Sequence, residues 1–121
     1  MKLYIKEVTH LANYNPDNWV VLKFTQFDKP VYRVLAGWSG GYLDGDSWRM
    51  NSGITEVKQD ADYYYFYGNT GSCYCCRKTS NIMRMNIANT YSAIVERYGD
   101  DVSLCDEGTD YTNIDYKGTQ Q

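Results

Sequence analysis

Arginine, asparagine and aromatic residues recur in two stretches of the sequence, the WRMNS segment at residues 48–52 and the start of a predicted helix near Ser80. A guanidinium group binds phosphate oxygens bidentately, an amide pairs with a base or ribose edge, and an aromatic ring stacks on a base. A helix N-terminus also favours an anion. The two stretches therefore predict a pocket for a small phosphorylated ligand. The polar candidates are Arg49, Asn51, Arg84, Asn86 and Asn89.

The same residues also have an ordinary structural interpretation. Arg49 can pair with Asp46 on the surface of a strand, and such exposed pairs contribute little to stability. Arg84 and Arg97 can form the solvated face of a helix. The sequence alone leaves both interpretations open.

Groups suited to catalysis or metal binding are sparse. The single histidine, His10, lies on a predicted helix, with no serine or cysteine in the context of an activated nucleophile. Cys73 and Cys75 would share one face of a strand and Cys105 could join them, but structural zinc sites use two cysteine pairs with spacings of about two to four residues. We therefore expect no enzymatic activity, no cofactor and no metal, with the cysteines packed as small thiols.

The densest aromatic stretch is YYYFYGNTGSCYCCR at residues 63–77. Aromatic residues favour strands and the GNTG run favours a turn, so the sequence predicts a hairpin. Because side chains alternate along a strand, Tyr64 and Phe66 share one face and the flanking tyrosines share the other. One face must be core, and the other is a stacking surface at a pocket rim or a subunit contact. The sequence does not decide which face is which.

Length and charge narrow the class of protein. The 121 residues with a formal net charge of −3 indicate a single domain, 1–121, and argue against a protein that coats long nucleic acid. No apolar run approaches the roughly 20 residues needed to span a bilayer and no signal peptide is evident, so we expect a cytoplasmic protein without membrane contact. Thirteen tyrosines favour a recognition surface, or equally a tyrosine-rich core and subunit interface.

The hydrophobic pattern predicts an α+β fold, with an antiparallel meander sheet of about five strands, a short N-terminal helix and a longer helix after the sheet. The helix is expected at residues 3–13, and strands at 19–24, 31–38 and 48–57, with a break in the last near Ser52 and Gly53. An irregular loop is expected at residues 39–47.

After the aromatic hairpin the pattern changes to helical spacing. Apolar residues recur at three- and four-residue steps up to Tyr98, with Ser80 as the predicted N-cap and Gly99 as the predicted end. A short strand is expected at residues 102–105. Residues 106–121 are expected to form a loosely ordered polar tail.

Four segments of the chain resemble small proteins carried by tailed phages. They are NPDNWVVLK at 15–23, YRVLAGWSGGY at 32–42, DSWRMNSGI at 46–54 and YYFYGNTGSCY at 64–74. Over residues 15–98 the chain resembles the first family of Thoeris anti-defence proteins, the phage sponges that sequester the signalling nucleotide made by TIR enzymes.

The resemblance implies an antiparallel sheet followed by helices, assembled as a homo-oligomer, a dimer or a higher oligomer such as a hexamer. It implies a small cyclic nucleotide ligand, a glycocyclic ADP-ribose isomer, that is bound without being cleaved. Some members of the family also take cyclic oligonucleotides at a separate site between subunits. By residue type and local context, the implied ligand-binding residues are Arg49, Asn51, Phe66, Tyr74, Arg84, Asn86 and Asn89.

Three functions are therefore compared below. The first is a phage anti-defence protein that sequesters a cyclic nucleotide immune signal in the host cytosol. The alternative is a phage-encoded protein-interaction module that inhibits a host protein through its tyrosine-rich face. A third is a small hydrolase of the same nucleotides.

Overall fold

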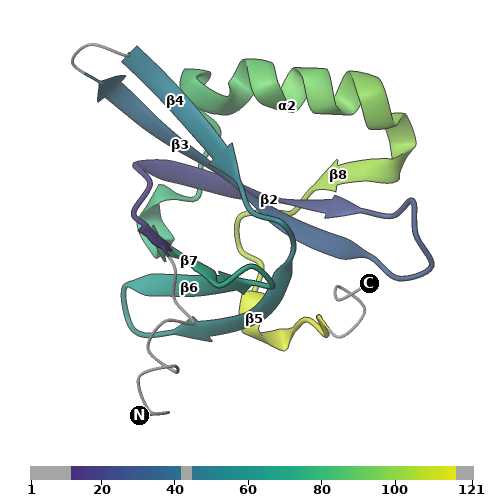
Figure 1. Cartoon of the computed structure of the whole chain (residues 1–121), viewed down its shortest axis with the longest axis horizontal. Helices are drawn as coiled ribbons and strands as arrows, with labels where there is room; N and C mark the ends of the chain where they lie inside the picture. The colour runs from purple at the N-terminus through teal and green to yellow at the C-terminus, as the bar shows by residue number, and fades with distance from the viewer. Residues whose placement is uncertain (1–11, 42–44, 117–121) are drawn as a thin grey trace.

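Two β-sheets and one long helix form the part of the chain that the computed structural model describes, residues 12–41 and 45–116 (Figure 1). The strands are β1 Ala12–Tyr14, β2 Asn18–Phe24, β3 Val31–Gly41, β4 Gly45–Met50, β5 Ile54–Gln59, β6 Tyr63–Gly68, β7 Ser72–Arg77 and β8 Val102–Leu104. Helix α2 spans Met85–Tyr98, and short 3₁₀ turns occupy Lys78–Ser80, Gly99–Asp101 and Tyr111–Asn113. The predicted α+β class with a helix after the strands is confirmed. The meander of about five strands is wrong, because the described residues hold eight strands in two four-stranded sheets.

The two sheets and the helix form three layers. We call the sheet with strand order β4-β3-β2-β8 the helix-covered sheet and the sheet with order β1-β7-β6-β5 the tyrosine sheet. Neighbouring strands are antiparallel except β1 and β7. Helix α2 lies along one face of the helix-covered sheet, and the tyrosine sheet lies on its other side (Figure 1). The helix-covered sheet is therefore the middle layer, and we also call it the middle sheet. It is buried on both faces, which explains why β2, NWVVLKF, is apolar almost throughout.

A separate hydrophobic core fills each of the two interfaces. Between the sheets, Trp19 of β2 packs with Phe66 of β6, and both side chains are fully buried. Between the middle sheet and the helix, Leu22 and Leu35 pack with Ile87 of α2. Adjacent strand residues serve opposite cores because side chains alternate between the faces of a sheet.

The predicted strand at residues 48–57 is in fact two strands of different sheets. β4 belongs to the helix-covered sheet and β5 to the tyrosine sheet, and the chain passes between them at residues 51–53. Gly53 has a φ of 144°, a conformation that side chains disfavour. The Asn51 side chain continues the strand pairing, because its Oδ1 accepts a hydrogen bond from the Val34 N–H at 2.8 Å. The predicted break is thus the crossover between the two sheets.

The loop predicted at residues 39–47 is largely strand. β3 continues to Gly41 and β4 starts at Gly45, on either side of residues 42–44, which lie outside the described residues. The pairing register shifts between Trp38 and Gly41, and Gly40 has a φ of 71°. A bulge therefore accounts for the glycine-rich sequence that suggested a loop.

The predicted N-terminal helix at residues 3–13 lies mostly outside the described residues, and its last two positions are not helical. Ala12–Tyr14 form β1, which pairs in parallel with β7, so that Asn13 lies opposite Cys73 and Tyr14 opposite Tyr74. The free edge of β7 pairs with the backbone of this short segment. A helical count of apolar residues cannot reveal such a long-range pairing.

The predicted helix N-cap at Ser80 is wrong, because α2 starts at Met85 after an extended Arg84. The preceding segment is held instead by the middle sheet, since Asn81 forms a parallel bridge with Trp19. The predicted end is confirmed: Gly99 has a φ of 55°, and its N–H donates to the carbonyl of Val95. The short strand predicted after the helix is confirmed as β8.

The polar segment that follows β8 contributes two rings to the inter-sheet core. Tyr111 is fully buried against Trp19 and Phe66, with ring centroids 5.9 and 5.5 Å away. Tyr116 packs on Tyr32 at 5.6 Å, and its hydroxyl donates to the Tyr111 carbonyl at 2.6 Å. Residues 117–121 lie outside the described residues. Among the helices of the described residues, none has the length and apolar character needed to cross a membrane.

Candidate ligand-binding site

The aromatic hairpin β6–β7 has one face in the core and one face directed outward. Tyr64, Phe66, Tyr74 and Cys76 face the helix-covered sheet. Phe66 is fully buried, and its ring lies 5.4 Å from that of Trp19. It therefore supports the fold, and a ligand has no access to it in a single chain.

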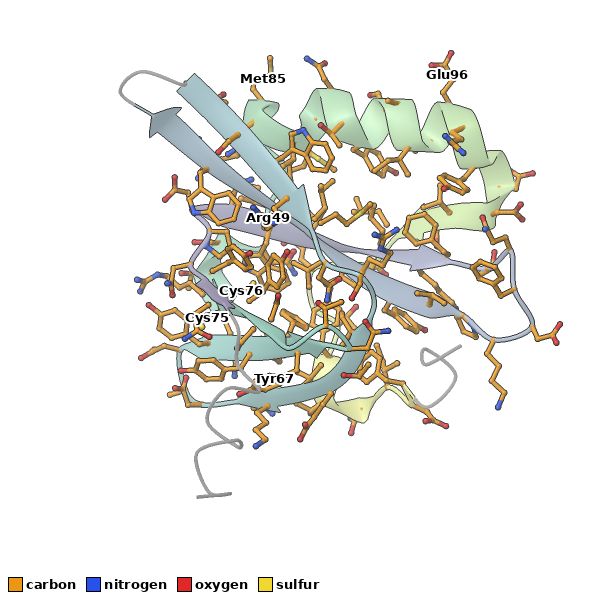
Figure 2. All side chains as sticks on the ribbon, viewed as in Figure 1. Arg49, Tyr67, Cys75, Cys76, Met85 and Glu96 are labelled. Carbon is orange, nitrogen blue, oxygen red and sulfur yellow. The ribbon has the colours of Figure 1, made fainter. Side chains whose placement is uncertain are left out.

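Tyr74 belongs to the same buried face but lies next to the edge of the sheet. Its ring is 4.9 Å from Tyr14 of β1, and Tyr14 is 6.3 Å from Trp38 of β3. The guanidinium carbon of Arg49, on β4, lies 4.5 Å from the centre of the Tyr14 ring. Figure 2 shows Arg49 on the helix-covered sheet. We call Tyr14, Trp38, Arg49 and Tyr74 the aromatic rim, because they bridge the two sheets where β1 and β4 form their edges.

Arg49 is exposed, and its charge has no carboxylate partner within the described residues. The one ion pair in that part of the chain joins Lys58 and Glu56 at 4.0 Å, both well exposed. The predicted pairing of Arg49 with Asp46 is not formed, since the Asp46 carboxylate accepts from the Gly40 N–H at 3.2 Å. Guanidinium donors that rest on a ring and face solvent are free to bind an incoming anion.

Hydrogen bonds fix the aromatic part of the rim before any ligand arrives. The Trp38 indole Nε1 donates to the Asn15 carbonyl at 3.0 Å, and the Ser39 N–H donates to the Asp17 carboxylate at 2.8 Å. Burial raises the pKa of Tyr74 to about 12, although the nearby Arg49 charge acts in the opposite direction. Tyr74 therefore stays neutral at physiological pH, and Arg49 gives the rim its positive charge.

Asn51 has a structural position and does not reach the rim. Asn51 is 3% exposed. Its backbone carbonyl accepts a hydrogen bond from Arg33 Nε at 2.7 Å, and its side-chain oxygen accepts one from the Val34 N–H. Its side-chain nitrogen has no hydrogen-bond partner in the described part of the chain. The amide faces the space above Gly68, where an added Cβ would lie 3.6 Å from that nitrogen.

Asn86 holds the start of helix α2 on the sheet. Its Nδ2 donates to Asn18 Oδ1 at 2.6 Å and to Ser39 Oγ at 3.0 Å, and Asn18 Nδ2 donates back to Asn86 Oδ1 at 3.1 Å. The amide lies directly on Gly37, where an added Cβ would come within 2.6 Å of it. Asn86 is thus a buried clamp, with little surface left for a ligand.

The two other helical candidates are exposed. Arg84 precedes the first turn of α2, and Asn89 lies on its outer surface one turn later. They are on the face of the middle sheet opposite to Arg49, whose side chain reaches toward the tyrosine sheet. The structure therefore divides the seven predicted site residues among three places. Two lie at the rim, Arg49 and Tyr74; three are buried, Asn51, Phe66 and Asn86; and two are exposed near the helix start, Arg84 and Asn89.

Two rim residues were missed from the sequence. Tyr14 follows the helix predicted at residues 3–13 and belongs to no predicted element, and Trp38 ends the strand predicted at residues 31–38. Tyr14 directly precedes the segment NPDNWVVLK and Trp38 lies within the segment YRVLAGWSGGY, and pairing of β1 with β7 is what brings Tyr14 to Tyr74. No local sequence pattern indicates the pairing of β1 with β7.

Cys73 and Cys76 are buried thiols of the hairpin that stay protonated at physiological pH. Burial strongly raises the pKa of Cys76, and burial with the neighbouring Cys75 raises the pKa of Cys73 to about 12. The Cys73 and Cys75 sulfurs are 3.9 Å apart. In the part of the chain that the structure describes, no three metal-ligating side chains gather in one place. The candidate His10 lies outside that part.

Comparisons of the chain with protein-family models, with curated proteins and with solved structures give no match.

Proposed function

We propose that this chain is a phage anti-defence protein that binds a cyclic nucleotide immune signal at the aromatic rim and sequesters it without cleavage. The observation that carries the proposal is the position of the Arg49 guanidinium, 4.5 Å above the Tyr14 ring and without a carboxylate partner in the described residues. A phosphate group binds such a guanidinium bidentately, while an adjacent ring offers a stacking surface for a base. The resemblance to the Thoeris anti-defence sponges points to the same class of ligand, glycocyclic ADP-ribose.

A second chain is part of this proposal. Arg84 and Asn89 lie on the other face of the sheet from Arg49, so one chain does not bring the predicted polar residues to one ligand. In a homo-oligomer, the helix start of one subunit can face the rim of its neighbour. The resemblance implies such an assembly, and sequestration in the host cytosol requires only that the oligomer holds the ligand tightly.

The direct test is binding of the unmodified signal. Calorimetry and thermal unfolding would be carried out with cyclic ADP-ribose isomers and cyclic trinucleotides, with linear ADP-ribose as the control. We expect saturable binding of a cyclic ligand and a melting temperature that rises with its concentration. Chromatography after long incubation and heat release should return the ligand intact. Absence of any interaction would reject the proposal, and recovery of a cleaved product would favour the hydrolase.

The alternative function has its own structural support, the outward face of the tyrosine sheet. Tyr63 and Tyr65 stack there with centroids 5.9 Å apart and an interplanar angle of 23°, and Arg77 lies 5.1 Å from the Tyr63 ring. All three tyrosines of this face, including Tyr67, are partly exposed. Rigid tyrosines next to an arginine are typical of protein recognition surfaces.

This surface would inhibit a host protein instead of binding a small molecule. A pull-down with wild-type protein and with the double variant Tyr63→Ser, Arg77→Ser would test it, because both residues are at the outer face and neither is fully buried. A partner that is captured by the wild type and lost in the variant supports the interaction module. Equal capture by both proteins, together with saturable nucleotide binding, excludes it.

A further inference from the structure

A groove of about 300 Å³ lies on the helix-bearing face of the middle sheet, where β2 continues beyond the end of β8. β8 pairs only with Leu22–Phe24, and upstream the edge of β2 meets residues 81–83 through a single bridge. The two neighbouring segments leave a space between them, with the buried side chain of Val20 beneath it. Figure 1 shows β8 at the edge of the sheet beside helix α2.

The walls of this groove are apolar and exposed. Among the described residues, five large hydrophobic side chains are exposed, and two of them, Ile82 at 44% and Leu104 at 39%, line this one groove. Met83 adds a flexible, half-buried thioether to the same wall. Singly exposed apolar residues need no explanation, but two that converge on one hollow indicate a surface that is covered in use.

One end of the groove is negatively charged. Asp106 and Glu107 are exposed at its border, and neither forms an ion pair within the described residues. The turn that carries them is fixed, because the Asp106 carbonyl accepts from Thr109 Oγ1 at 2.7 Å and from the Thr109 N–H at 3.2 Å. Lys23 rests on the Tyr32 ring on the other face of the sheet. The two carboxylates are therefore available to an incoming cation.

We propose that this groove binds a short peptide segment of a partner protein in which a large aliphatic residue is followed by lysine or arginine. The aliphatic side chain would lie on Val20 between Ile82 and Leu104, and the cationic side chains would pair with Asp106 and Glu107. Charge complementarity selects this occupant, because a nucleotide would bring negative charge toward the two carboxylates. The groove lies on the opposite face of the middle sheet from the aromatic rim, so the site does not depend on the nucleotide-binding proposal.

The test uses fluorescence anisotropy with the full chain and a labelled peptide of sequence Ser-Leu-Lys-Arg-Ser. Two control peptides replace either the Lys-Arg pair by Glu-Glu or the Leu by Ser. We expect saturable binding of the first peptide only, weakened at least about tenfold by the double variant Asp106→Lys, Glu107→Lys, because two attractive charge pairs become repulsive. Leu104→Ser should weaken it similarly without changing its salt dependence.

Matched control variants distinguish this site from general surface effects. Glu96→Lys changes an exposed charge on α2 that points away from the sheet (Figure 2), and Phe27→Ser removes an apolar side chain that is 56% exposed in the β2–β3 turn. Both should bind the peptide as the wild type does. Absence of saturable binding, or equal binding of the Glu-Glu peptide, would overturn the proposal. So would sedimentation showing a dimer that Leu104→Ser dissociates, because a second copy would then be the occupant.

Discussion

Trp48 and Arg49 are neighbours in the chain, but their side chains lie on opposite faces of the helix-covered sheet. Trp48 pairs with Gly37, against which Asn86 of the helix packs, whereas Arg49 pairs with Ala36 and reaches Tyr14 of the other sheet. Strand geometry makes this separation unavoidable. The WRMNS segment therefore serves two surfaces, and only Arg49 belongs to the aromatic rim.

Because of this separation, two arginine substitutions test whether the pocket is built from one chain or from two. Arg49→Ala should weaken binding of the cyclic nucleotide by about 1.5–3 kcal/mol, because it removes a charge-assisted contact to phosphate. The melting temperature of the unliganded protein should change little, since Arg49 is exposed and forms no ion pair with the described residues. Calorimetry measures the first quantity and thermal unfolding the second.

Arg84→Ala is the matched comparison, because Arg84 is also exposed but lies at the helix start. If a ligand contacts one chain only, this variant should bind within about 0.5 kcal/mol of the wild type. A loss as large as that of Arg49→Ala would show that the helix start of a neighbouring subunit completes the pocket. Unchanged affinity in Arg49→Ala itself would place the pocket away from the rim.

Asn86 should matter for stability and not for ligand contact. Asn86→Ala leaves the buried Asn18 Oδ1 without its donor, while Asn18 Nδ2 keeps its hydrogen bond to the Ile82 carbonyl at 3.2 Å, so we expect a loss of about 1–3 kcal/mol in the free energy of unfolding. In a double-mutant cycle with Asn18→Ala, the two losses should be less than additive, because the second substitution removes an oxygen that is already unpaired. Urea denaturation measures all four proteins. Asn89→Ala, on the exposed side of the same helix, is the control and should cost less than about 0.5 kcal/mol.

Additive losses in that cycle would contradict the reciprocal hydrogen bonds seen between the two amides. A third substitution gives independent evidence. Gly37→Ala places a methyl group within 2.6 Å of the Asn86 amide, so it should destabilise the wild type but be better tolerated when residue 86 is alanine.

The local parts of the fold could be predicted from the sequence, and the long-range parts could not. The β2–β3 and β6–β7 hairpins follow from aromatic and β-branched runs around short turns, and the end of α2 follows from Gly99. The partition into two sheets depends on the crossover at residues 51–53, where a strand break looks the same whether the chain returns to one sheet or enters another. β1 and β8 are three-residue strands whose existence depends on the partner edge.

Prediction of the candidate site was limited for the same reason, because the sequence does not show which residues far apart in the chain lie close together in the fold. Residue type drew attention to Arg49, which the structure places exposed beside the Tyr14 ring, but alternation alone could not decide which face of the hairpin is core. Phe66 is therefore a ligand contact in the prediction from the sequence, although in the structure the rings of Trp19, Tyr64 and Tyr111 pack around it in the inter-sheet core. Tyr14 was overlooked because its role depends on a pairing with a strand about sixty residues away.

Phe66→Ala tests that correction. Removal of a fully buried ring from between Trp19 and Tyr111 should cost about 3–5 kcal/mol of the free energy of unfolding, through lost burial and the cavity left behind. Ligand affinity, corrected for the folded fraction, should stay close to that of the wild type. Denaturant titration and calorimetry at low temperature measure the two effects. A specific loss of affinity in a fully folded variant would return Phe66 to the binding site.

The buried tyrosines predict loss of stability in alkaline solution. Burial raises the pKa of Tyr111 from 10.0 to about 12, so the folded protein holds this phenolic proton more tightly than the unfolded chain does. Stability should therefore be at its full value below about pH 10 and decline as the pH rises from about 10 to about 12, because the unfolded state then gains by releasing the proton. Urea midpoints across this range measure the decline.

The control variant is Tyr111→Phe. Buried thiols also contribute to the alkaline loss of stability, so the quantity to compare is the difference in that loss between the wild type and Tyr111→Phe. The Tyr111 hydroxyl donates a long hydrogen bond, 3.4 Å, to the Asp106 carbonyl and also interacts with the side chains of Asn81 and Thr109, so the variant should lose about 1 kcal/mol of stability at neutral pH. Its alkaline decline should be shallower than that of the wild type, and identical slopes would show that Tyr111 does not contribute to alkaline unfolding.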